Sequence, residues 1–424
     1  MKITRTIGRD VTVKADERSL SNLNTLVIGA TGAGKTRGYV SPNISAADTE
    51  SMVIIDSKLN LYKKHMKELK DKGYRVELID LCCTSNSSIG YNPLDMIRKD
   101  QKSKTVRTDD INELADWICS DDEFHDSNDP FWQLASRQYI SACIHLCFHI
   151  LPDDEHDLTI VGKLLNLMNQ PEWSELINEA ELNDPEAFEV LFDRTVRTNR
   201  KAERMHASIS GIAGTAMALY TWDDCDKLYS APVRFNPASL GDTKTALFIN
   251  VPDHDHSKTP IVRLFFSQCI KVLLDHADSC PKSRLKIPVH LYCDDIGASF
   301  VIPHLPELLS ITRSRGISVS LILQNWGQLE AKYGSHSAST IAGNCSIAVY
   351  LGCTDIETPR YFSEKANIPL DRITGMPLDT ELVLIQGQKP FFTRKYNADD
   401  YRPVEYVSGE CGNGRSTDYG KETI

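Results

Sequence analysis

The fold of this 424-residue chain is decided by the stretch TLVIGATGAGKT, residues 25–36. Its first four residues are an apolar run that predicts a buried strand. The next eight residues fill every fixed position of the phosphate-binding loop G-x-x-x-x-G-K-[ST], and they are Gly29, Ala30, Thr31, Gly32, Ala33, Gly34, Lys35 and Thr36. With a strand before the loop and a helix opening at Gly34, a glycine-rich turn that binds nothing is the weaker interpretation.

Each part of the loop has a distinct chemical task. Glycines let the backbone approach a phosphate closely, while successive N–H groups and the helix N-terminus supply positive potential. We expect Lys35 to neutralise the β- and γ-phosphates and the Thr36 hydroxyl to ligate Mg²⁺. The loop therefore predicts a site for a nucleoside triphosphate with Mg²⁺.

Length and composition bound the class of protein. A chain of this length buries a large core and is expected to form two or three folding units. With 41% hydrophobic and 25% charged residues, the composition is that of a soluble globular protein. The net charge of −11 argues against a surface that coats duplex DNA nonspecifically, although a basic inner channel is compatible with it.

No stretch of the sequence predicts a membrane span or a secretory signal. The longest apolar candidate, residues 139–151, is too short to cross a bilayer and contains two histidines, so we expect a buried helix. The N-terminal residues lack the apolar segment of a signal peptide. We therefore expect a cytoplasmic chain without a transmembrane segment.

The first 95 residues predict the opening of a parallel α/β sheet. Apolar strands are expected at residues 51–55 and 74–80, in addition to 25–28. Leu61, His65 and Leu69 mark one face of the helix between the later two strands, and Gly73 closes that helix. This β-α-β-α-β order is typical of a mostly parallel sheet and predicts the α/β class.

The middle of the chain predicts a helical insertion into that sheet. Strand-like runs vanish from about residue 96 to 228, where acidic and amide residues rise and residues 111–119 and 131–150 show helical periodicity. Strands resume at residues 245–250, 289–293, 317–323, 347–350 and 381–385. We therefore expect a first half of the nucleotide-binding domain (1–95), an all-α domain (96–228), the second half of the nucleotide-binding domain (229–407) and a flexible tail (408–424).

A second set of site residues follows the strand at 289–293. This apolar strand ends in Asp294 and Asp295, as expected for a Walker B element in which the first acid reaches Mg²⁺ and the second positions or deprotonates water. By themselves, two acids after an apolar run often mark only a strand meeting solvent. The intact phosphate loop upstream favours the functional interpretation.

Three further side chains are candidates for the chemistry. Gln324 follows the next strand, and an amide there would lie near the γ-phosphate and sense it, although an ordinary loop amide is the alternative. Arg313 and Arg315 lie at an exposed helix end, where a guanidinium would serve as an arginine finger in a neighbouring subunit. The alternative for the arginines is a solvated helix C-terminus, where cations are mildly favourable.

Several segments together resemble the type IV secretion coupling proteins, the TraG/TraD-like conjugation ATPases. The likeness spans nearly the whole chain, and the order of its segments is more specific than any one of them. The segments are residues 29–36 with Pro42-Asn43, Asp56-Ser57-Lys58, Tyr91-Asn92-Pro93-Leu94, Phe131-Trp132, residues 313–318, residues 324–333 and Gly343-Asn344-Cys345.

The resemblance implies a RecA-like P-loop core interrupted by an all-α domain that recognises the relaxase-bound substrate. It implies a homo-hexameric ring that threads DNA at the secretion channel, recruited to the inner face of the cell membrane. By analogy, Lys35, Thr36 and Asp294 hold MgATP, Asp295 is the catalytic acid, Gln324 is the sensor, and Arg313 or Arg315 is the finger.

The chain departs from the family pattern in two places. Many members begin with transmembrane helices, whereas this sequence contains none, so a form without the anchor is expected. Asp295 stands where glutamate is common, and its side chain is one methylene shorter, which predicts slower turnover. Asp56 and Lys58 lie at a strand end near the loop, where an ion pair that fixes the turn and a nucleotide contact are equally compatible with the sequence.

The sequence therefore predicts an ATP hydrolase that recruits a relaxase–DNA substrate and drives it into a type IV secretion channel. One alternative is another ring DNA translocase, a segregation or packaging motor, which shares the core but not the helical insertion. The other is a docking receptor that binds nucleotide, hydrolyses little and uses the acidic insertion as its interaction surface.

Overall fold

The computed structural model describes residues 3–15, 22–100, 105–120, 130–198, 203–252, 255–294 and 301–400. A nine-stranded sheet has the order β11-β10-β9-β3-β8-β7-β4-β6-β5. Its strands are β3 (Thr25–Ile28), β4 (Ser51–Ile55), β5 (Arg75–Asp80), β6 (Thr245–Asn250), β7 (Val289–Asp294), β8 (Ile317–Leu323), β9 (Ile347–Tyr350), β10 (Thr380–Ile385) and β11 (Phe391–Arg394). The strands from β9 to β5 pair in parallel, and β10 and β11 add antiparallel pairs at one edge. The predicted mostly parallel sheet is confirmed.

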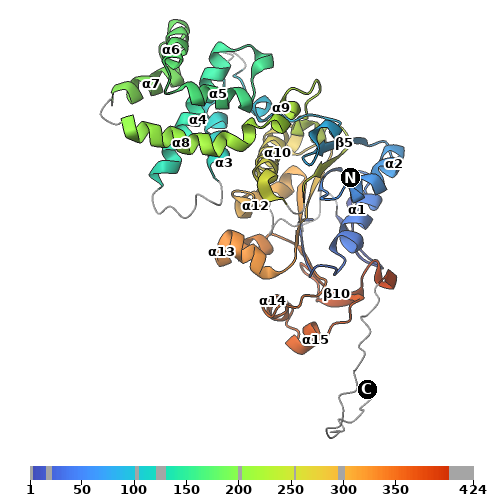
Figure 1. Ribbon diagram of the computed structural model, residues 1–424. Helices are drawn as coiled ribbons and strands as arrows, with labels where there is room; N and C mark the ends of the chain where they lie inside the picture. Colours follow the sequence, from blue (N-terminus) through green and yellow to red (C-terminus); the bar gives the residue numbers. More distant parts are fainter. Residues whose placement is uncertain are drawn as a thin grey trace, which may run out of the picture.

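Both faces of the sheet are covered, which explains why its inner strands are continuous apolar runs. In β3, Leu26 and Ile28 belong to the core on one face and Val27 to the core on the other. One face packs against α1 (Ser41–Ala46) and α2 (Asn60–Asp71). The opposite face packs against α10 (Thr259–Ser279), α12 (Leu305–Arg315) and α13 (Trp326–Gly343), with α14 (Glu357–Ala366) and α15 (Leu370–Thr374) beyond them (Figure 1).

The helix α2 has the face that its sequence predicts. Its buried residues are Leu61, His65 and Leu69. Gly73 follows the helix with a φ of 78°, a left-handed conformation that glycine adopts without a steric penalty. The periodic pattern and the terminal glycine therefore located this helix correctly.

Three strands were missed by sequence analysis. β1 (Ile3–Gly8) and β2 (Val11–Ala15) form a separate antiparallel hairpin, and β11 extends the edge of the large sheet. Residues 11–15 alternate between apolar and polar side chains, as expected for a half-buried strand, whereas residues 3–8 place three polar side chains in a row and carry no such signal. The side chain of Asn43 in α1 holds β1 through two hydrogen bonds. The N–H of Thr6 donates to Asn43 Oδ1 at 2.8 Å, and Asn43 Nδ2 donates to the carbonyl of Thr6 at 2.7 Å.

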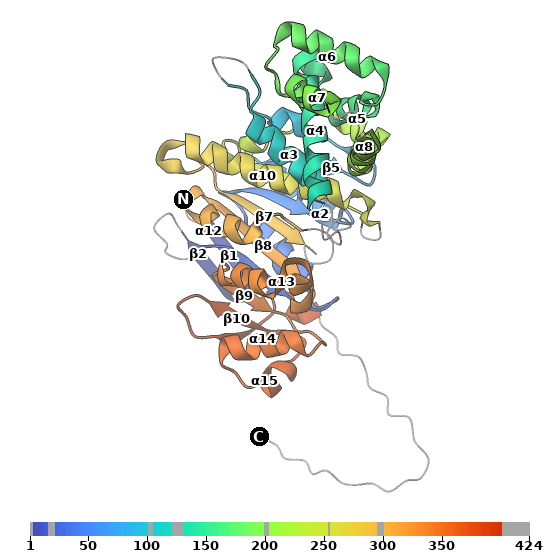
Figure 2. The same cartoon turned by 90° about the vertical axis from the view of Figure 1, so that its left-hand side faces the viewer.

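Between β5 and β6 the described residues form helices and add no strand to either sheet. They gather at the end of the molecule next to β5, as the two views of the ribbon show (Figures 1 and 2). The helices are α3 (Thr108–Cys119), α4 (Phe131–Ile150), α5 (Leu158–Leu167), α6 (Pro171–Asn183), α7 (Phe188–Thr198), α8 (Glu203–Ala218) and α9 (Asp223–Tyr229). The helical character expected for residues 96–228 is thus observed over the described part of that interval.

Two expectations concern residues beyond the described ranges. Asp295 lies outside them, as does the tail at 408–424. Within the described ranges, no helix is both long enough and apolar enough to cross a lipid bilayer.

Candidate functional site

The phosphate loop lies at the carboxyl end of β3, in the middle of the sheet. Gly34 has a φ of 95°, and the helical turn η1 (Lys35–Val40) begins directly after it, as the sequence predicts. A side chain at Gly29 would lie 2.7 Å from Cβ of Leu351, so only glycine allows this close passage between neighbouring strand ends. The loop geometry therefore needs glycine at two of the motif positions for separate reasons.

The Lys35 ammonium lies against the loop itself. Its Nζ donates to the carbonyl of Gly29 at 2.7 Å and to that of Ala30 at 3.2 Å. The N–H of Ala30 in turn donates to Gly352 O at 2.9 Å, across the end of β9. The loop is thus tied to the adjacent strand, and the Lys35 ammonium is bonded to its first two carbonyl groups.

The strand order brings together the two residues predicted to hold the metal. Thr36 Oγ1 donates to Asp294 Oδ2 at 3.0 Å, although the two residues are 258 positions apart in sequence. Asp294 is the last residue of β7, which lies two strands from β3 with β8 between them. A hydroxyl and a carboxylate oxygen at this spacing are the hard ligands that Mg²⁺ prefers beside a phosphate loop.

Gln324 lies next to this group, directly after β8. Leu323 at the end of β8 accepts a hydrogen bond from the N–H of Gly29 at 3.1 Å. The backbone carbonyl of Gln324 accepts from the Cys353 thiol at 3.1 Å, and its N–H donates to Gln328 Oε1 at 3.0 Å. Burial raises the pKa of Cys353 to about 12, so this thiol stays protonated as a donor. Gln324 is therefore held by its backbone at the carboxyl end of the central strands.

The two arginines lie at the opposite edge of the sheet. They end α12, which leads into the first residue of β8, and a seven-residue strand separates that edge from the loop by roughly 20 Å. Arg315 pairs with Asp278 of its own chain through Nε at 2.9 Å and Nη2 at 3.1 Å, whereas the Arg313 side chain is exposed. Neither arginine reaches the phosphate loop of the same chain.

Asp56 fixes the start of α2. Its carboxylate accepts from the backbone N–H of Asn60 at 3.1 Å and of Tyr62 at 2.8 Å. The pKa of Asp56 is raised, because the effect of burial outweighs the opposite effect of these backbone hydrogen bonds. Asp56 therefore fixes this turn through backbone N–H groups, while the ion pair with Lys58 and the nucleotide contact both stay predictions.

Sequence analysis missed one side chain that contacts the loop. Lys395 follows β11, is almost completely buried, and donates from Nζ to the carbonyl of Ala33 at 3.0 Å. Burial lowers the pKa of Lys395 to about 8 and raises that of the neighbouring Glu381, in β10, to about 8. Lys395 lies 362 residues from Ala33 in the sequence, so no local sequence pattern predicts their contact.

Comparison with known proteins shows to which family the chain belongs. The family described as Type IV secretory system Conjugative DNA transfer matches residues 3–366. A curated relative, the type IV secretion system-coupling protein VirD4 of Bartonella quintana (strain Toulouse), is 22% identical over 291 residues, which is 67% of this chain and 44% of that protein. The chain spans about half the length of the curated relatives it matches.

Solved structures share the fold. The unbound bacterial conjugative coupling protein TrwBdeltaN70 has a TM-score of 0.64 at 17% identity, covering 88% of this chain and 84% of that one. The plasmid coupling protein TrwB in complex with ADP and Mg²⁺ has a TM-score of 0.62 at 18% identity, covering 88% and 85%. At these identities the likeness establishes the RecA-like P-loop core.

Proposed function

The chain belongs to the type IV secretory system conjugative DNA transfer family, and from this premise we propose that it is an ATPase coupling protein. It recruits a relaxase–DNA substrate and drives that substrate into the secretion channel. The observation that carries the proposal is the 3.0 Å contact between Thr36 and Asp294, because it joins a phosphate loop to a carboxylate from far along the chain.

The residues present fit a bound MgATP. The loop residues 29–36 offer backbone N–H groups to the phosphates, and Lys35 neutralises their charge. Thr36 and Asp294 would supply oxygen ligands for Mg²⁺. The bound ion would neutralise negative charge on the phosphate oxygens during transfer. A TrwB structure with ADP and Mg²⁺ supports this assignment, since its core is similar.

For hydrolysis we assign one task to each remaining candidate. Asp295, directly after the metal ligand, orients and deprotonates the attacking water. Gln324 hydrogen-bonds the γ-phosphate and reports its loss. Arg313 completes the site of a neighbouring subunit by stabilising transition-state charge, with Arg315 as the second candidate. The position of both arginines, roughly 20 Å from their own loop, favours action between subunits.

The proposal extends to domains and partners. Residues 1–95 and 229–407 form the nucleotide-binding domain, residues 96–228 form an all-α domain that recognises the relaxase, and residues 408–424 are a tail. The active form is a homo-hexamer that contacts DNA and channel components at the inner face of the membrane. The net charge of −11 argues against nonspecific DNA contact over the surface and is compatible with contact in a basic inner channel.

Lys35→Ala tests the nucleotide site. The variant is expected to lose ATP turnover and substrate transfer while keeping its fold, because the deleted side chain is partly exposed and bonds to the loop itself. Lys389→Ala, an exposed lysine on the loop before β11, is the matched control and should retain both activities. Full turnover by Lys35→Ala would overturn the proposal.

A docking receptor with little hydrolysis is the second candidate, and the acidic helical interval favours it. The two functions differ in ATP turnover measured with and without single-stranded DNA at a protein concentration that allows assembly. Stimulation by DNA supports the motor. A negligible rate that DNA leaves unchanged supports the receptor.

A further inference from the structure

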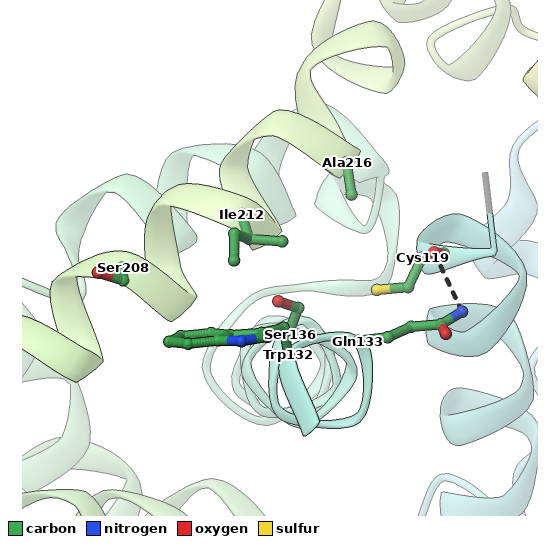
Figure 3. A pocket seen from close by; sticks show the side chains of 7 residues that line it. All are labelled: Cys119, Trp132, Gln133, Ser136, Ser208, Ile212 and Ala216. Atoms are coloured by element: carbon green, nitrogen blue, oxygen red, sulfur yellow. Dashed lines mark hydrogen bonds between the residues drawn. The ribbon is translucent and has the colours of Figure 1, made fainter. Parts of the chain in front are cut away.

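An apolar pocket opens among the helices that precede β6, far from the phosphate loop. It has a volume of about 240 Å³ and lies between the end of α3, the first turns of α4 and one face of α8 (Figure 3). Trp132 lines it from α4, and Ile212 and Ala216 line it from α8. A cavity of roughly 150 Å³ with similar walls is large enough to bind benzene, so this pocket has room for an aromatic side chain.

The pocket contains one buried hydroxyl without a partner. Ser136 is 1% exposed, and its Oγ has no hydrogen-bond partner among the described residues. Figure 3 shows Ser136 projecting from α4 into the space between Trp132 and Ile212. A buried hydroxyl left unpaired is unfavourable, so a ligand group that pairs with it binds more tightly than the same ligand without that group.

The other polar groups of the lining are already neutral or engaged. The Gln133 amide donates to the carbonyl of Cys119 at 3.4 Å. Burial raises the pKa of the Cys119 thiol to about 12, so it carries no charge. The pocket is therefore uncharged and suits a neutral ring that carries a single hydrogen-bonding group.

The surface around the pocket is apolar and exposed. Phe131, next to Trp132, is 44% exposed, and Met205, one turn before the pocket on α8, is 38% exposed. On the same helix, side chains added at Gly211 and Gly214 would meet no atom within 4 Å. Glycine destabilises a helix relative to alanine, and nothing within the described chain packs closely enough against these two positions to explain them. Exposed apolar side chains beside a groove-like helix face are typical of a protein interface.

The charge of this region indicates which partner fits. Residues 95–228 make up less than a third of the chain but contain nearly half of its 58 acidic residues and little more than a quarter of its 47 basic ones. This interval therefore accounts for more than the whole net charge of −11. The net negative charge of this interval disfavours nucleic acid and favours a positively charged segment as the partner.

We infer that the pocket receives a tyrosine side chain from a positively charged segment of a transported protein, with the phenol hydroxyl paired to Ser136 and the ring against Trp132. The inference rests on the proposed function of these helices as the cargo receptor. It adds the point of contact and the chemistry that the cargo must present. The alternative ligand, an unpaired nucleic acid base stacked on Trp132, is disfavoured by the net negative charge of this interval.

The test uses the full chain and a set of short helical peptides as probes. The parent probe is lysine-rich with one central tyrosine, and its relatives carry phenylalanine or alanine at that position, or glutamates in place of the lysines. Binding is measured by fluorescence anisotropy of labelled peptide. We expect the tyrosine probe to bind about 10-fold more tightly than the alanine probe and the glutamate probe to bind no more than weakly.

Two variants locate the contact. Ala216→Phe fills the pocket and should weaken the tyrosine probe about 10-fold, whereas Ala218→Phe, exposed on the same helix, is the matched control and should leave it unchanged. Ser136→Ala should abolish the roughly 2- to 10-fold preference for tyrosine over phenylalanine without weakening the phenylalanine probe. Ser136→Ala removes an unpaired hydroxyl, so its fold is expected to be at least as stable as that of the parent.

Equal binding of the tyrosine and alanine probes, or unchanged binding by Ala216→Phe, would overturn the inference. Displacement of the tyrosine probe by single-stranded DNA from the parent but not from Ala216→Phe would assign the pocket to nucleic acid and would also overturn it. ATP turnover of Ala216→Phe should match the parent in either case. Failure of the proposed function is a separate result, because it appears as turnover or transfer that survives Lys35→Ala.

Discussion

At the scale of single residues, the hydrogen bond between Thr36 and Asp294 is the contact on which the proposed metal site rests. Thr36→Ala and Asp294→Asn should each weaken Mg²⁺-dependent nucleotide binding about 10-fold or more, because a hydrogen-bonding or ligating group of a charged pair is worth roughly 1.5–3 kcal/mol. Titration with a fluorescent ATP analogue, with and without Mg²⁺, measures the effect. Asp371→Asn, an exposed acid on α15, is the control. A variant whose Mg²⁺ dependence matches the parent would contradict the assignment.

Lys395 has a separate task at the same loop. Lys395→Met removes the donor to the carbonyl of Ala33, so the loop should be less ordered and bind nucleotide about 3- to 10-fold more weakly. The weakening should appear with and without Mg²⁺, which distinguishes it from loss of a metal ligand. Lys389→Met, at an exposed position before β11, should bind nucleotide as the parent does. Equal affinity of Lys395→Met and Lys389→Met would show that the contact has no influence on the loop.

Glu381 predicts a pH dependence of stability. Burial raises its pKa from 4.5 to about 8, so the folded chain holds this proton more tightly than the unfolded chain does. Its contribution to stability is therefore fully present below about 4.5 and is lost as the pH rises to about 8. Glutamine does not titrate, so Glu381→Gln should not lose stability in this way. The free energy of unfolding in urea should therefore exceed that of the parent by an amount that grows with pH over that range. A constant difference between the two proteins would exclude this group as the source.

At the scale of elements, Asp56 secures α2 to the end of β4. Asp56→Ala leaves the N–H groups of Asn60 and Tyr62 without this acceptor and should lower the free energy of unfolding by about 1 kcal/mol. Chemical denaturation gives the value. Asp71→Ala, exposed at the other end of the same helix, should not destabilise, since an acid there opposes the helix dipole. If Asp56→Ala retained the stability of the parent but lost nucleotide affinity, the nucleotide-contact alternative would be the correct one.

The elements also show where local sequence patterns are sufficient. β3, β4, β6, β8 and β9 coincide with their predicted residue ranges, because strands buried on both faces are continuous apolar runs that end where the chain meets solvent. The hairpin of β1 and β2 and the edge strand β11 were not predicted. β2 and β11 are partly exposed, and β1 is buried but has polar residues at its centre, so none of the three is a continuous apolar run.

At the scale of the whole molecule, the position of the arginines predicts that turnover requires assembly. Arg313→Ala should lower ATP turnover more than Arg315→Ala, because the Arg313 side chain is exposed whereas that of Arg315 is only partly exposed. Lys35→Ala and Arg313→Ala should each be nearly inactive alone but recover activity when mixed, since mixed assemblies contain sites with an intact lysine and a neighbour's arginine. Arg315→Ala mixed with Lys35→Ala provides the comparison. Absence of recovery in the first mixture would exclude Arg313 as a finger acting between subunits.

The sequence by itself determined the phosphate loop, most of the strands, the helical interval and the family resemblance, because each depends on residues close together in the chain. The tertiary structure alone decided the strand order. That order brings Asp294 to Thr36, joins Lys395 to Ala33, and separates both arginines from the loop of their own chain. It also decided the pocket over Ser136, which needs three helices to pack. Periodicity fixes which face of an element is buried, but the partner that buries it depends on packing between distant segments.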